Sequence, residues 1–130
     1  MYQFPIGAMV DSFRQDTREA IKTAAAIGVQ GLQMYATNGE NSPENLVGQK
    51  RKDLLNYVKD HGLTFSAICG DLGKAFIYPE RNVMLIEKSK RIMDLAKELE
   101  TDVVTTHIGV IPTDKTCERY KVMQIGRAHV

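Results

Sequence analysis

The chain repeats one pattern three times: an amphipathic helix, a tight turn, and a short apolar segment typical of a buried strand. A further apolar segment precedes the first helix. Because strands that are separated by helices cannot pair as hairpins, this β-α-β-α-β-α-β order predicts a parallel sheet with right-handed connections. The fold class is therefore α/β, a parallel (β/α) repeat of about four units. The predicted strands are 6–10, 31–36, 63–69 and 102–107, and the predicted helices are 17–27, 49–61 and about 85–99.

The first two predicted helices carry recognisable start and stop signals. Asp16 is placed to cap the first helix, and Glu19, three residues later, would complete a capping box. Gly28 follows that helix and Gly62 follows the second, where a left-handed residue ends a helix at little cost. These signals support the predicted boundaries.

The third helix has the clearest two-sided pattern. Charged residues occupy one side, and the run "EKSKR" (87–91) is interpreted as a solvated helix face with a Glu87–Arg91 pair, not as a basic binding patch. The opposite side is predicted to be buried and consists of Leu85, Ile86, Ser89, Ile92, Met93, Ala96 and Leu99.

Composition excludes several classes of function. The 130 residues suffice for one domain, and a net charge of +1 with 7% aromatic residues argues against nucleic acid or an anionic membrane as a partner. The N-terminus, "MYQFPIGAMVDSF", lacks the basic and apolar regions of a signal peptide or a membrane span. Cys69 and Cys117 match no metal-binding or redox spacing. We expect a cytoplasmic protein with reduced thiols.

Polar residues follow each of the four predicted strands. In parallel α/β folds the carboxyl ends of the strands lie along one edge, where binding sites form. Four polar strand ends on one edge predict the wall of a pocket, although helix caps and turns use the same residue types. The residues at these ends are Asp11, Ser12, Tyr35, Asn38, Asp71, Thr106 and His107.

His107 is the strongest functional candidate among them. Its imidazole could polarise a substrate oxygen or hold a hydroxyl group at neutral pH, or it could be a partly buried histidine bonded to a carbonyl. Asp71 could bind a sugar hydroxyl, but Gly70-Asp71 is equally a turn. His61 ends a helix, where positive charge is favourable, and is interpreted as structural.

Other motifs are incomplete. "GDLGKAF" (70–76) differs from a phosphate-binding loop in the spacing of its first glycine and in having Ala75 where Ser or Thr is required. The chain has neither a G-x-G-x-x-G after a strand nor a histidine or carboxylate pair at metal-ligand spacing. Cys69 has no identifiable base and is interpreted as a small apolar strand residue.

Three segments of the chain, in order, carry a family resemblance: "AAAIGVQGLQMYA" (24–36), "HGLTFSAICGDLG" (61–73) and "KSKRIMDLAKELETDVVTTHIGVIP" (88–112). They resemble the sugar phosphate isomerase/epimerase family, the xylose isomerase-like TIM barrels. The likeness covers about residues 4–123, and Gln33 stands where the family often has a glutamate.

The resemblance implies the N-terminal half of a (β/α)₈ barrel, since such barrels have about 250 residues. Family members bind Mn²⁺ or Mg²⁺ through ligands on the last four strands and transfer a proton next to a sugar carbonyl with paired glutamates. The resemblance therefore implies that this chain binds no metal alone and has no catalytic residue of its own. It also implies a small-molecule sugar or sugar phosphate as ligand, with His107, Asp71, Tyr35 and Thr106 as substrate-binding residues.

The last six residues are expected to be foreign to the natural protein. "IGRAHV" (125–130) breaks the helical pattern of "CERYKVMQ" (117–124). The codons ATC-GGA-AGA-GCA-CAC-GTC would encode it, and that string resembles a common DNA-sequencing adapter. We expect residues 1–124 to form strands 1–4 of a barrel and residues 125–130 to be a non-native tail.

Two other interpretations remain open at this point. The chain could be a small flavodoxin-like domain for ligand binding or regulation, with strand order 2-1-3-4 and helices on both faces. It could also be a half-barrel that closes eight strands as a homodimer. A four-stranded sheet that does not close leaves two edges, so self-association through these edges is expected.

Overall fold

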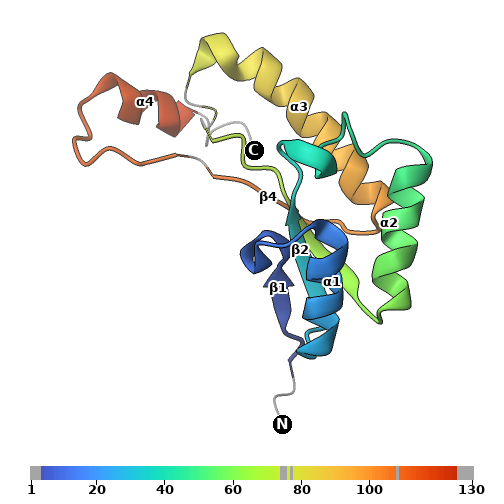
Figure 1. Cartoon of the computed structure of the whole chain (residues 1–130). Coiled ribbons are helices and arrows are strands. Elements are labelled where there is room, and N and C mark those ends of the chain that lie inside the picture. Colours follow the sequence, from blue (N-terminus) through green and yellow to red (C-terminus); the bar gives the residue numbers. More distant parts are fainter. Residues whose placement is uncertain (1–3, 74–75, 77, 108, 126–130) are drawn as a thin grey trace.

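The computed structural model describes residues 4–73, 76, 78–107 and 109–125, in which strands and helices alternate (Figure 1). The strands are β1 (Gly7–Met9), β2 (Gly31–Tyr35), β3 (Thr64–Cys69) and β4 (Val104–Thr105). The helices are α1 (Thr17–Ala26), α2 (Gln49–Asp60), α3 (Pro79–Glu98) and α4 (Glu118–Ile125). Short 3-10 turns, η1 (Val10–Phe13) and η2 (Gly39–Asn41), follow β1 and β2.

The four strands form one parallel sheet whose spatial order, β1-β2-β3-β4, is also their order along the chain. Helices α1, α2 and α3 cover one face of this sheet, and α4 lies apart from it (Figure 1). Sequential strand order with helices on one face is the arrangement of a barrel wall. The predicted half-barrel is confirmed, and the 2-1-3-4 order of the open sheet is wrong.

The core lies between the sheet and its three helices. Alternate residues of a strand point to opposite faces, so each strand gives only half of its side chains to this layer. The largest fully buried side chains come from both layers and are Ile21, Leu32, Met34, Val58, Ile68, Ile92, Leu95 and Leu99.

The opposite face of the sheet corresponds to the interior of a closed barrel. The strand register places Met9, Gln33 and Ala67 in one row across this face. A second row, nearer the carboxyl ends, contains Tyr35, Cys69 and Thr105. This face carries the polar side chains of the sheet, and its lower part, including Thr64 and Ser66, is exposed.

The predicted helix signals act largely as expected. One carboxylate oxygen of Asp16 accepts hydrogen bonds of 3.1 Å from the backbone N–H groups of Arg18 and Glu19. The Glu19 carboxylate contacts Lys22 at 2.7 Å, so the second half of the capping box is replaced by an ion pair. Gly28 has a φ of +82°, in the left-handed region that ends α1.

Helix α3 differs from the sequence prediction in its start and in its buried face. It begins at Pro79, because proline is well suited to the first turn of a helix. Ile86 and Met93 are exposed, whereas Leu95, which the prediction omitted, is fully buried. The buried stripe is therefore rotated by about one residue and consists of Leu85, Ile92, Leu95, Ala96 and Leu99.

The charged side of α3 also pairs differently from the prediction. Glu87 contacts Lys90 at 2.8 Å, and Arg91 reaches Glu44 on the loop before α2, at 3.5 Å. The predicted Glu87–Arg91 pair is thus replaced by two others: Glu87 pairs with Lys90 within the helix, and Arg91 pairs with Glu44 on another segment. Both are exposed pairs, and such pairs contribute little to stability.

The outer strands are shorter than predicted. The chain leaves β1 after Met9 and enters η1, and β4 contains only Val104 and Thr105. No described helix combines the length and the apolar character needed to cross a bilayer. Residues 126–130, most of the predicted foreign tail, lie outside the described residues.

Candidate functional site

Four of the predicted polar residues form two contacts along the carboxyl edge of the sheet, Asp11 with Tyr35 and Asp71 with His107. Asp11, just after β1, accepts a hydrogen bond of 3.0 Å from the backbone N–H of Tyr35 at the end of β2. The carboxylate takes the place of a backbone acceptor and continues the β1–β2 contact beyond Met9. Asp11 therefore fixes the position of Tyr35 on this edge.

Asp71 and His107 form a hydrogen-bonded pair between the ends of β3 and β4. His107 Nδ1 lies 2.6 Å from Asp71 Oδ2, and Asp71 Oδ1 accepts a hydrogen bond of 2.9 Å from the Gly73 N–H. The Asp71 side chain is 22% exposed and that of His107 is 74% exposed. Asp71 thus belongs both to the Gly70-Asp71 turn and to the candidate site: Oδ1 accepts the hydrogen bond of the turn, and Oδ2 contacts His107.

The Asp71 carboxylate is held in its ionised form. The Gly73 N–H, chiefly, and His107 lower the pKa of Asp71, while partial burial opposes them. An ionised carboxylate only accepts hydrogen bonds, so the proton in this contact belongs to His107 Nδ1. The other ring nitrogen, Nε2, is then available to a ligand.

Tyr35 adds a protonated hydroxyl group to the same edge. The neighbouring Cys69 is the main cause that raises the pKa of the tyrosine, followed by burial and the Asp71 and Asp11 carboxylates. The phenol is therefore a hydrogen-bond donor at neutral pH. Cys69 itself is buried and acts as a packed neighbour, in line with its interpretation as a small apolar residue.

Thr105, and not Thr106, contributes its hydroxyl to the barrel-interior face. The Gln33 side-chain amide donates a hydrogen bond of 2.8 Å to the Thr105 hydroxyl. Thr106 is exposed, and its side chain has no hydrogen bond to any residue in the described part of the chain. The sequence marks the two threonines as equivalent, and only the pleat of β4 separates their roles.

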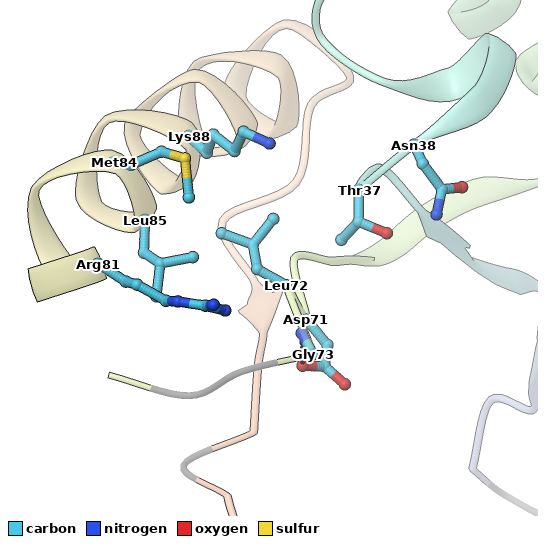
Figure 2. A pocket seen from close by; sticks show the side chains of 9 residues that line it. All are labelled: Thr37, Asn38, Asp71, Leu72, Gly73, Arg81, Met84, Leu85 and Lys88. Carbon is cyan, nitrogen blue, oxygen red and sulfur yellow. Dashed lines mark hydrogen bonds between the residues drawn. The ribbon is translucent and has the colours of Figure 1, made fainter. Parts of the chain in front are cut away.

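A cavity of about 310 Å³ adjoins the Asp71–His107 pair (Figure 2). It lies between the loops after β2 and β3 and the first half of α3. Of the residues that line it, the sequence analysis had named only Asn38 and Asp71 as candidate site residues. Arg81 and Lys88 were missed, although their seven-residue spacing places them on one face of the helix. The cavity is lined by Thr37, Asn38, Asp71, Leu72, Gly73, Arg81, Met84, Leu85 and Lys88.

The described residues contain no group of three or more histidine, cysteine or carboxylate side chains that could hold a metal ion. Asp71 and His107 are in contact at this edge, and their near atoms bind each other. This donor set does not fit a divalent metal site.

The sequence of the chain matches a known family over most of its length. Residues 21–126 match the family described as xylose isomerase-like TIM barrel. The chain belongs to this family. Within a xylose isomerase-like barrel, the edge that carries Asp71 and His107 is the one where TIM-barrel enzymes place their active sites.

Solved structures share the fold of this xylose isomerase-like chain. A xylose isomerase domain protein from Planctomyces limnophilus superposes with a TM-score of 0.68 at 17% identity, over 96% of this chain and 48% of its own. The probable 3-DHS dehydratase AsbF from Bacillus anthracis superposes with a TM-score of 0.71 at 19% identity, over 96% of this chain and 46% of its own. A sugar phosphate isomerase/epimerase from Parabacteroides distasonis ATCC 8503 superposes with a TM-score of 0.64 at 17% identity, over 96% of this chain and 45% of its own.

The chain thus spans about half the length of these solved structures. Its four parallel strands and alternating helices correspond to the N-terminal half of the xylose isomerase-like barrel. No curated protein matches the sequence.

Proposed function

We propose that the chain is the N-terminal half of a metal-dependent sugar or sugar phosphate isomerase or epimerase of carbohydrate metabolism. The observation that carries this proposal is the Asp71–His107 pair, 2.6 Å apart at the carboxyl edge of a xylose isomerase-like barrel. The pair presents an exposed ring nitrogen of a histidine, the group best suited to exchange protons at neutral pH.

Four polar residues at the edge take part in substrate binding in this proposal. Asp71 orients the imidazole, so that His107 Nε2 faces a sugar hydroxyl or carbonyl oxygen and accepts or returns its proton. The Tyr35 hydroxyl donates to a second substrate oxygen, and Thr106 offers a hydroxyl from the exposed end of β4. His107 is thereby a substrate-binding residue that also handles protons.

A divalent metal, Mn²⁺ or Mg²⁺, belongs to the complete barrel in this proposal. It supplies Lewis-acid polarisation of a carbonyl when bound. In this proposal its ligands come from the last four strands of the barrel, and this half alone is inactive.

The fold itself is compatible with more than one reaction. Its structural neighbours include proteins named isomerase/epimerase and one named dehydratase. Function depends on the residues grafted onto a fold, so the choice rests on Asp71, His107 and the groups that complete the site.

The test uses a reading frame that completes the eight strands, assayed with Mn²⁺ against a panel of ketoses and ketose phosphates. His107→Ala should lower turnover or substrate affinity by about 10²-fold, the scale of a lost proton-transfer group. His61→Gln is the control, because His61 Nδ1 contacts the Tyr57 carbonyl oxygen at 2.8 Å, away from the sheet edge. Unchanged kinetics of His107→Ala would reduce the pair to scaffolding.

We also propose that this half associates with itself through the outer strands. Among the described strands, β1 pairs only with β2 and β4 pairs only with β3, so each leaves one edge open. Open edges and an uncovered face favour pairing with another chain. A cytoplasmic location is the third part of the proposal, supported by Cys69 and Cys117 being free thiols.

A further inference from the structure

The cavity beside Asp71 has the chemistry of an anion site. We propose that it binds an oxyanion, a phosphate or a carboxylate, carried by the substrate. That the oxyanion belongs to the substrate rests on the proposed function. That the cavity binds an oxyanion rests on the cavity alone. At about 310 Å³ the cavity lies at the lower end of the range of small-molecule pockets.

Two cations of α3 line this cavity. The pKa of Glu44 is lowered chiefly by a backbone hydrogen bond, with smaller contributions from Ser42, Arg91 and Lys88, so Lys88 has this carboxylate within electrostatic range but forms no ion pair with it. Arg81 and Lys88 are seven residues apart, so they lie on the same side of the helix, two turns from each other. Their side chains extend from the helix toward the two loops in Figure 2. Neither forms an ion pair with any residue that the structure describes.

A second cavity on the same helix shows the contrast. It is lined by Arg51, Arg91 and Lys97 together with Asp94 and Glu98. Arg51 contacts Glu98 at 2.6 Å, and Arg91 contacts Glu44 at 3.5 Å. Two of the three cations there are thus paired with carboxylates, whereas neither cation of the cavity beside Asp71 forms an ion pair with a described residue.

The carboxylate in the lining forms no ion pair with either of the two cations. Asp71 is the only acidic residue among the described residues that line the cavity, and its oxygens contact His107 Nδ1 and the Gly73 N–H. The described lining therefore carries two cationic side chains and one carboxylate. Thr37 and Asn38, on the opposite loop, supply neutral groups that can donate hydrogen bonds. The donors and cations thus surround the space from two sides (Figure 2).

The position of Asp71 connects the cavity with the proton-handling pair. The same residue lines the cavity and holds His107 at 2.6 Å. An oxyanion held between Arg81 and Lys88 would place the rest of its molecule against Asp71 and His107. The geometry therefore favours a sugar with a charged group at one end over a neutral sugar.

The test measures binding of inorganic phosphate and of malonate to the chain by isothermal titration at constant ionic strength. The double variant Arg81→Gln/Lys88→Gln should bind about tenfold or more weakly, which corresponds to about 1.4 kcal/mol. Arg91→Gln/Lys97→Gln is the matched control, with the same charge change on the same helix at the second cavity. It should bind within about twofold of the unaltered chain.

A charge-preserving variant, Arg81→Lys/Lys88→Arg, guards against loss of folding and should retain binding. Tighter binding of phosphate assigns a phosphorylated sugar, and tighter binding of malonate assigns a sugar acid. Equal binding of phosphate by the two glutamine variants overturns the site. The same difference between these variants with chloride in place of phosphate also overturns it. Anion binding is measured on this chain alone and turnover on the completed eight-stranded protein, so failure of the anion site and failure of the proposed catalysis are separate results.

Discussion

The side-chain amide of Gln33 donates a hydrogen bond of 2.8 Å to the hydroxyl of Thr105, across strand β3, which lies between their strands. Ala67 is the register partner of Gln33, and its small side chain leaves room for this contact. The bond ties β2 to β4 on the barrel-interior face. A residue that departs from the usual glutamate of the family therefore has a structural use in this chain.

Thr105→Val removes the acceptor of this bond without changing the size of the side chain. We expect the free energy of unfolding to fall by about 1 kcal/mol, because the Gln33 amide loses its partner in a partly buried position. Thr106→Val, one residue further on and exposed, should change it by less than about 0.5 kcal/mol. Urea unfolding of the two variants measures the difference, and equal effects would show that the bond has no stabilising role.

Asp71 should make stability depend on acid pH. Its pKa is lowered in the folded chain, chiefly by the Gly73 N–H and then by His107, from an unfolded value of about 3.9. The resulting stabilisation is complete above about pH 5 and is lost as the pH falls through the folded-state value. Asp71→Asn should be less stable than the unaltered chain at pH 7, and the gap should close toward pH 3. Thermal melts over this range measure it, with Asp102→Asn as control; a gap independent of pH would contradict it.

Gly70 is a glycine because two core side chains approach it. A Cβ at this position would lie 3.0 Å from Val104 Cγ1 and 3.3 Å from Ile92 Cγ2. Gly70→Ala should therefore destabilise the chain by about 1–3 kcal/mol through overpacking. In a double-mutant cycle, Val104→Ala should remove part of this cost. Simple additivity of the two changes would show that the close approach is not the cause.

The outer strand β4 should control self-association. Val103, next to β4, is 49% exposed, so Val103→Lys places a charge beside the open edge, a common protection of edge strands. We expect sedimentation to show less association at a given concentration. Val47→Lys is the matched control, since Val47 is 47% exposed but precedes α2, away from the sheet. An equal reduction in both variants would point to net charge instead of the edge.

Local signals in the sequence were enough to place most elements. The Asp16 cap and the left-handed Gly28 act within a few residues, so short-range geometry specifies them. The alternation of helix and strand also determined that the sheet is parallel. The start of α3 at Pro79 was missed, because the apolar pattern becomes regular only from Leu85.

The candidate site shows where local signals stop. Asp71 and His107 were each identified from their places after a strand, yet their contact joins residues 36 positions apart. The position of Thr105 on the barrel-interior face depends on the pleat of β4. The pairing of Arg81 depends on which acidic side chains lie near α3. No pattern in the chain encodes such distances directly.

The sequence by itself determined the order of elements, their helix ends and the polar character of the carboxyl edge, because these follow from bonds and periodicities within a few turns. Only the tertiary structure decided the order β1-β2-β3-β4, the pairing of Asp71 with His107 and the position of Arg81 and Lys88 at one cavity. These depend on packing and charge between distant segments, where the nearest partner in space determines the chemistry.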